Sequence, residues 1–102
     1  MRPRAVIIGP TARADLADLY DWIANSATAP VADRYVSRVM DFIDGLDLAS
    51  ERGTRVDHIR SGVRVVGFEG RLTIAFEVDD HDVRILSVFR AGQDWAAILS
   101  DR

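Results

Sequence analysis

Apolar residues recur along residues 11–24 at the spacing of a single helix face. Leu16, Leu19, Tyr20 and Ile23 follow one another at intervals of three or four positions. This spacing predicts an amphipathic helix whose apolar stripe is buried against another element.

The two ends of this helix carry local signals. Thr11 is a residue type that caps helix N-termini, so we expect it to cap this one. Asp15 falls on a different face from the apolar stripe, and we expect it to remain in water. Residues 25–30 (NSATAP) interrupt the pattern, and Pro30 suits the first turn of a second helix.

The second helix repeats the stripe of the first. Its apolar positions are Ala32, Tyr35, Val36, Val39, Ile43 and Leu46. Two amphipathic helices joined by a short break predict an antiparallel helical hairpin. Both stripes need a further surface to cover, which we expect to be a sheet.

Four segments are rich in β-branched and aromatic residues, as strands are: 5–8, 63–68, 72–78 and 83–89. The links between the last three are short enough for hairpins, and they contain Gly and Asp. These strands are therefore predicted to form an antiparallel meander.

The remaining segments complete the order of elements. Residues 50–54 (SERGT) are polar and read as a loop. Asp94 is expected to cap a short final helix over residues 95–99. The predicted fold is α+β, in the order β-α-α-β-β-β-α, with the helical hairpin on one face of a small, mainly antiparallel sheet.

Composition places the chain among small folded proteins. With 102 residues, 48% hydrophobic and 28% charged, residues 1–102 are expected to form a single domain. There is no cysteine, which excludes disulfides and thiolate metal sites. His58 and His81 are far apart and lack ligand spacing, so we expect neither a metal nor a cofactor.

Hydropathy and charge indicate the cellular location of the protein and the kinds of partner it binds. The apolar run at the start is too short for a signal peptide and no later stretch has the length of a membrane span, so we expect a cytoplasmic protein. The net charge of −3 argues against specific binding of nucleic acid by the chain alone. All 13 basic residues are arginine.

An ordered set of short motifs resembles one known family. Residues 12–24 (ARADLADLYDWIA) and 32–39 (ADRYVSRV) are similar to the two helices of ParE-type toxins. Residues 59–64 (IRSGVR), 70–78 (GRLTIAFEV) and 83–95 (VRILSVFRAGQDW) resemble its strands and their continuation. Together these motifs identify the chain as a member of the RelE/ParE toxin superfamily.

The resemblance implies the toxin of a bacterial type II toxin–antitoxin pair. It implies a ParD-like antitoxin as partner in a hetero-oligomeric complex, and DNA gyrase as the cellular target. One alternative is a ribosome-dependent RNase of RelE type. Another is a degenerate member that only binds its antitoxin.

The residues that RNA cleavage requires are poorly represented. Lysine is absent, Tyr20 and Tyr35 have the spacing of helix stripes, and Thr73 stands where the resemblance would place an arginine. Arginine is a poor proton shuttle because its pKa is too high. We therefore expect a protein that inhibits by binding and is not an enzyme. A triad of Ser61, His58 and Asp57 lacks the supporting elements of a hydrolase fold.

Candidate target contacts lie in the C-terminal half: Arg60, Arg64, Arg71, Arg90 and Trp95. Arg and Trp dominate protein–protein hot spots. We expect Arg90 and Trp95 to lie near each other where the last strand leads into the final helix. The alternatives are arginines that only solvate the sheet and a tryptophan that packs on the core.

Candidate antitoxin contacts lie on the predicted hairpin: Leu19, Tyr20, Ile23, Arg34, Tyr35 and Arg38. The apolar members are core positions of which only the rim need be exposed. The two arginines suit an acidic antitoxin segment. Trp22 is expected at the core or rim of the hairpin, away from the target.

Overall fold

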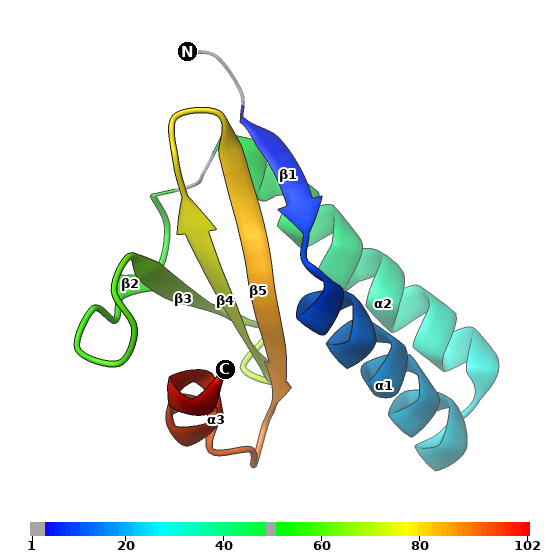
Figure 1. The fold of residues 1–102 in the computed structure, drawn as a ribbon. Coiled ribbons are helices and arrows are strands. Elements are labelled where there is room, and N and C mark those ends of the chain that lie inside the picture. Colours follow the sequence, from blue (N-terminus) through cyan, green and yellow to red (C-terminus); the bar gives the residue numbers. More distant parts are fainter. Residues whose placement is uncertain (1–3, 49–50) are drawn as a thin grey trace.

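The computed structural model describes residues 4–48 and 51–102, and it confirms the predicted α+β fold with one added strand (Figure 1). The elements are β1 (Ala5–Ile8), α1 (Pro10–Ser26), α2 (Ala29–Asp44), a 3-10 turn η1 (Gly45–Asp47), β2 (Thr54–Arg55), β3 (Val63–Phe68), β4 (Leu72–Val78), β5 (Asp82–Arg90) and α3 (Trp95–Asp101).

The strands form one mixed sheet in the order β1-β5-β4-β3-β2. Strands β2 to β5 are antiparallel neighbours. The short links predicted this pairing for β3, β4 and β5. Strand β1 lies parallel to β5 but covers only residues 82–85 of it. The C-terminal half of β5 therefore extends beyond β1 and borders α1 instead.

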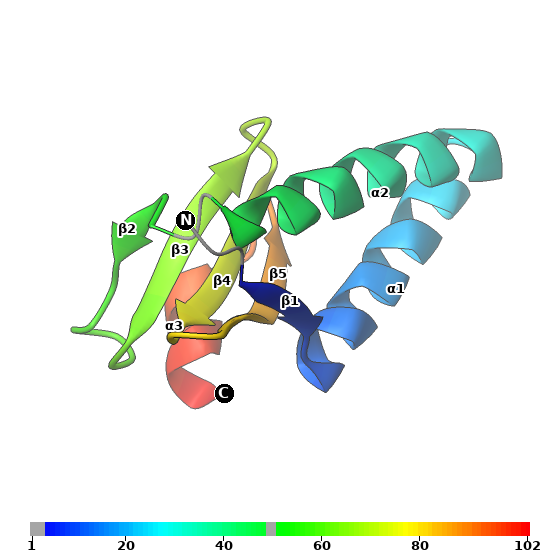
Figure 2. The same cartoon turned by 90° about the horizontal axis from the view of Figure 1, so that it is seen from above.

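The sheet is covered on both faces (Figure 2). The helical hairpin of α1 and α2 packs on one face through a core that includes Leu16, Val39 and Phe76. The short helix α3 packs on the other face, where Leu99 joins Phe89 in a second, smaller cluster. The prediction of a hairpin on one face is correct, and the second face is covered as well.

A register shift between Ala75 and Phe76 changes which residues of β5 face the hairpin. Before the shift, Val83 and Ile85 contribute to the hairpin core. After it, Val88 contributes to that core while Phe89 belongs to the second cluster. A β-bulge has this effect because the extra residue reverses the alternation of side chains.

The helix ends match the sequence signals in part. Thr28 caps α2, where its hydroxyl accepts from the Val31 N–H, and Asp94 caps α3 in the same way through the Ala97 N–H. The expectation for Thr11 is wrong. Gly9 is the N-cap of α1, Pro10 opens the helix and Thr11 lies within its first turn, because proline already has the backbone angle that a first turn needs.

The predicted loop at 50–54 is shorter than expected. Residue 50 lies outside the described residues, and Thr54 begins β2, a two-residue strand paired with β3. So short and polar a strand has no hydrophobic pattern to reveal it. Within residues 4–48 and 51–102, no helix has both the length and the apolar character needed to cross a bilayer.

Candidate functional site

An apolar hollow lies between the connected ends of α1 and α2 and the adjoining end of the sheet. It encloses about 460 Å³. We call it the hairpin groove, and it is lined by Leu19, Trp22, Ile23, Ser26, Ala27, Val31, Tyr35, Arg71, Leu72, Arg90 and Ala91. Residues from four elements and three connecting segments thus meet at one place.

The walls of the groove are apolar side chains that the protein's own core leaves partly uncovered. Trp22 on α1 is 54% exposed, and Val31 on α2 is also exposed. Leu19 and Leu72 are buried beneath them. Exposed large apolar side chains around a hollow mark a surface for binding a partner more often than a solvated face.

Arg90 forms the rim of the groove. The register shift in β5 turns its side chain to the hairpin face, where its guanidinium lies 4.9 Å from the centre of the Trp22 ring. The Arg90 N–H donates to the Gln93 side-chain oxygen at 2.6 Å, which fixes the end of the strand. A cation–π pair of this kind presents a flat apolar surface with a positive edge.

Tyr35 places a polar atom in the apolar wall. Its hydroxyl is buried and has no hydrogen-bond partner among residues 4–48 and 51–102. Burial raises the pKa of Tyr35, and the nearby Glu69 carboxylate adds to this effect. The phenol therefore stays neutral.

The charge of the groove is positive. Arg71 and Arg90 line it, and none of the described residues that line it is acidic. Apolar walls with a basic rim fit a segment that carries apolar residues beside a carboxylate.

The other candidate antitoxin contacts lie outside the groove. Tyr20 borders a shallow hollow with Asp33, and a hydrogen bond to Asp33 raises the pKa of the Tyr20 phenol. Arg34 is exposed on α2. Arg38 is already engaged, because it donates to both carboxylate oxygens of Glu69 at 3.0 and 3.1 Å.

The candidate target contacts are dispersed. Arg71 and Arg90 line the groove together with Ile23 and Tyr35, which are candidate antitoxin contacts. Arg64 instead donates to the Glu51 carbonyl oxygen at 3.1 Å. Arg60 lies in another hollow at the start of α1.

The expected proximity of Arg90 and Trp95 is wrong. Trp95 packs with Phe89 and Leu99 on the face opposite the hairpin, whereas Arg90 stacks on Trp22. Phe89 and Arg90 are consecutive in β5, so their side chains point to opposite faces of the sheet. Because Trp95 packs against Phe89, it lies on the face opposite to Arg90.

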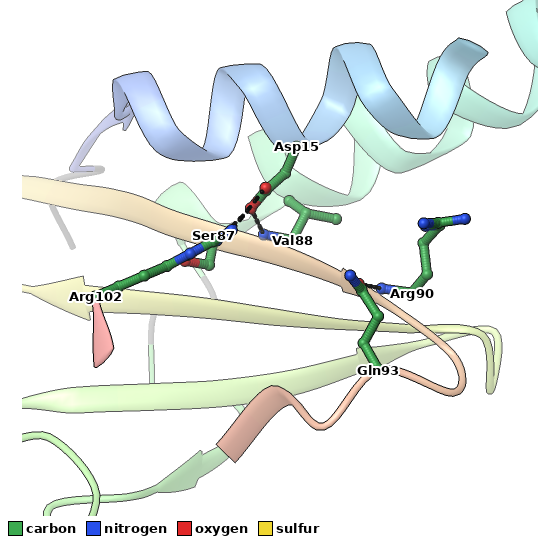
Figure 3. A network of polar contacts seen from close by, with 6 residues as sticks. All are labelled: Asp15, Ser87, Val88, Arg90, Gln93 and Arg102. Atoms are coloured by element: carbon green, nitrogen blue, oxygen red, sulfur yellow. Dashed lines mark hydrogen bonds and ion pairs between the residues drawn. The ribbon is translucent and has the colours of Figure 1, made fainter. Parts of the chain in front are cut away.

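The expectation that Asp15 stays in water is also wrong. Only 13% of its side chain is exposed. Figure 3 shows its carboxylate accepting from the Val88 N–H at 2.9 Å and from two nitrogens of Arg102 at 2.8 and 3.2 Å. Asp15 thus satisfies the edge of β5 that β1 does not reach, where a free N–H would otherwise invite pairing.

The described residues that line the groove include no His, Asp or Glu. Trp22, Tyr35, Arg71 and Arg90 supply shape and positive charge. Among the described residues there is no cluster of His, Asp and Glu that could hold a metal ion. The groove therefore offers a surface for binding.

Trp22 is the groove residue that sequence reasoning undervalued. It lies three positions after Leu19, at the edge of the apolar stripe, where a residue is half core and half surface. Its neighbours in the turn, Ser26 and Ala27, are small and leave its ring uncovered. That combination of a stripe-edge tryptophan and small neighbours is the available signal.

Comparison with known proteins gives a family and a fold. A family model described as "ParE toxin of type II toxin-antitoxin system, parDE" matches residues 6–95. No curated relative matches. A structure of the chromosomal ParDE toxin–antitoxin system from P. aeruginosa is similar at 22% identity and a TM-score of 0.75, covering 85% of this chain and 95% of that one.

A second solved structure has the same fold. It is the toxin–antitoxin complex RelBE2 from Mycobacterium tuberculosis, with 22% identity and a TM-score of 0.63, covering 86% of this chain and 98% of that one. Both likenesses concern the arrangement of helices and strands.

Proposed function

The chain belongs to the ParE toxin family of type II toxin–antitoxin systems, and from this we propose that its hairpin groove is where a cognate ParD-like antitoxin docks. The observation that carries the proposal is the apolar groove itself, walled by the exposed Trp22 and edged by Arg71 and Arg90. Its occupant is an antitoxin segment that folds as a helix on binding.

The chemistry of the groove specifies that segment. Its apolar residues recur at helical spacing to fill the space between Trp22, Ile23 and Tyr35, and an acidic residue faces Arg71 or Arg90. Coupled folding buries a large apolar area and gives a strongly negative heat-capacity change.

The cellular target that we propose is DNA gyrase, inhibited by binding and without chemistry on a substrate. The absence of lysine from the sequence and of a proton-transfer group from the groove supports this mode. Because residues assigned to the antitoxin and to the target meet in one groove, a bound antitoxin blocks the target contact.

Calorimetry with the purified antitoxin tests the docking site. Trp22→Ala removes an exposed hot-spot ring and should weaken antitoxin binding by roughly thirtyfold, the effect of losing about 2 kcal/mol. Leu48→Ala is the matched control, since Leu48 is an exposed apolar side chain (59%) outside the groove. Equal affinity of the two variants would place the antitoxin elsewhere.

The target is tested separately, by expressing the toxin alone. A gyrase-directed toxin should induce the DNA-damage response, and Arg90→Ala should lose toxicity while keeping its melting temperature. Arrested translation with cleaved messenger RNA would instead favour an RNase of RelE type.

A further inference from the structure

A second hollow, of about 180 Å³, lies at the first turn of α1 and shares no residue with the hairpin groove. Arg60, Arg84 and Arg102 line it together with Ser87. The three arginines come from the 56–62 segment, from β5 and from the end of α3. We call this hollow the arginine pocket.

Two of the three arginines in the arginine pocket, Arg60 and Arg84, have no strong ion pair with a carboxylate. Within the described ranges, the Arg60 guanidinium has no hydrogen bond or ion pair. Arg84 meets Glu77 only at 3.7 Å, with both side chains nearly half exposed, so this pair is weak. Arg102 is held by Asp15 and stays fixed in position. No acidic residue is among the described residues that line the pocket.

Ser87 supplies an independent observation. Its side chain is 1% exposed, and its oxygen accepts from Arg102 at 3.0 Å. In the part of the chain that the structure describes, the Ser87 hydroxyl donates no hydrogen bond. A buried hydroxyl with an unused donor costs free energy unless a ligand supplies an acceptor.

The backbone adds donors of the same kind. Gly9 has no side chain to cap α1, and Pro10 carries no N–H. The N–H groups of the next residues, Thr11 and Ala12, have no acceptor within residues 4–48 and 51–102. Free N–H groups at a helix start complement an anion that guanidinium groups already attract.

We propose that the arginine pocket binds a phosphate group. Two guanidinium groups, a serine hydroxyl and backbone N–H groups are the donor set that a tetrahedral, multiply charged oxyanion satisfies best. The phosphate belongs either to a nucleic-acid backbone or to a small free anion. The proposal does not depend on the function assigned to the hairpin groove.

Titration of the isotope-labelled toxin in a chloride buffer tests the proposal. Inorganic phosphate should shift the amide signals of Thr11, Ala12 and Ser87 along saturable curves. Arg60→Gln and Arg84→Gln should each weaken binding roughly tenfold. Arg34→Gln is the matched control, because Arg34 is exposed on α2 outside the pocket. This variant should bind phosphate as tightly as the parent protein.

Ser87→Ala separates a built site from general attraction by positive charge. It keeps every arginine and should still weaken phosphate binding severalfold. A parallel titration with a short oligothymidylate distinguishes the two sources. Tighter binding of the oligonucleotide, at the same amides and with competition by phosphate, identifies a nucleic-acid backbone; binding of phosphate alone identifies a small anion.

Two results would overturn the proposal. One is a set of linear, unsaturated shifts that chloride reproduces. The other is equal weakening by Arg34→Gln and Arg60→Gln, which would mean that net charge and not the pocket attracts the anion. Unchanged melting temperatures of the variants verify that each comparison concerns folded protein.

Discussion

The Tyr35 hydroxyl lowers the stability of the folded protein. This hydroxyl is buried in the wall of the hairpin groove and has no hydrogen-bond partner in the described part of the chain. An unsatisfied buried hydroxyl costs about 1–3 kcal/mol. Tyr35→Phe should therefore raise the free energy of unfolding, by about 0.5–1 kcal/mol once lost packing is included.

Chemical denaturation of the free toxin measures this change. Tyr20→Phe is the control, because the Tyr20 phenol has Asp33 as a partner and gains nothing from removal. A loss of stability in Tyr35→Phe would show that the hydroxyl has an acceptor after all.

Asp15 stabilises the fold, because its carboxylate accepts hydrogen bonds from two different parts of the chain. It accepts from Val88 on β5 and from Arg102 beyond α3 (Figure 3). Asp15→Ala should cost about 2 kcal/mol, because it leaves the Val88 N–H without an acceptor and the partly buried Arg102 guanidinium without its carboxylate partner.

Asp18→Ala is the matched change one turn along α1, where the side chain is exposed, and should stay within about 0.5 kcal/mol of the parent. Combining Asp15→Ala with Arg102→Ala should cost less than the sum of the two single changes. Strict additivity in thermal denaturation would rule out the ion pair as a source of stability.

At this scale the sequence predicted residue classes better than residue roles. The apolar stripe correctly marked Leu16 and Leu19 as core. The same pattern assigned Asp15 to water, because periodicity along one helix contains no information about a strand edge 73 residues away. Trp22 was undervalued for the same reason, since its exposure depends on the sheet's end.

Among the elements, the edge strand β2 depends on one glycine. Gly53 has φ +80°, and a Cβ there would clash with the Val65 carbonyl oxygen on β3. Gly62 has the same φ with nothing within 4 Å of the added carbon. Gly62→Ala should cost about 1 kcal/mol for backbone strain alone, and Gly53→Ala about 2 kcal/mol more.

Both variants have the same backbone strain. The difference between their free energies of unfolding therefore measures the effect of the close approach of Gly53 to β3. Urea denaturation of both proteins measures it. Equal losses would mean that the chain around Gly53 moves away from β3 without cost.

Element types and order were predictable, but the faces of β5 were not. Strict alternation would put Phe89 with Val83 and Ile85 beneath the hairpin, and Arg90 on the face of Trp95. The register shift at Ala75 and Phe76 reverses this assignment. A bulge arises from pairing between two strands, and one strand's own pattern does not encode it.

For the whole molecule, acid stability depends on carboxylates in three loops. A hydrogen bond from the Gly62 N–H lowers the pKa of Asp57, Arg38 lowers that of Glu69, and the His81 N–H lowers that of Asp79. A lowered folded-state pKa adds stability above the unfolded value and loses it as the pH falls.

The melting temperature should therefore be flat near neutral pH and decline below about pH 4.5, the ordinary value for glutamate. Glu69→Gln, Asp57→Asn and Asp79→Asn should each make the decline shallower. A steep loss that begins above pH 6 would contradict the assignment of the acid transition to these carboxylates.

The position of β5 in the sheet sets the timing of folding. Strand β5 lies between β1 and β4. Ile8, Leu16 and Leu19, from the first fifth of the chain, pack in a core that also contains side chains of β5. A ribosome must therefore translate nearly ninety residues before the hairpin has its sheet, and such distant pairing folds slowly. The nascent chain carries an unfinished core throughout synthesis, and the hairpin groove assembles only after β5 has emerged.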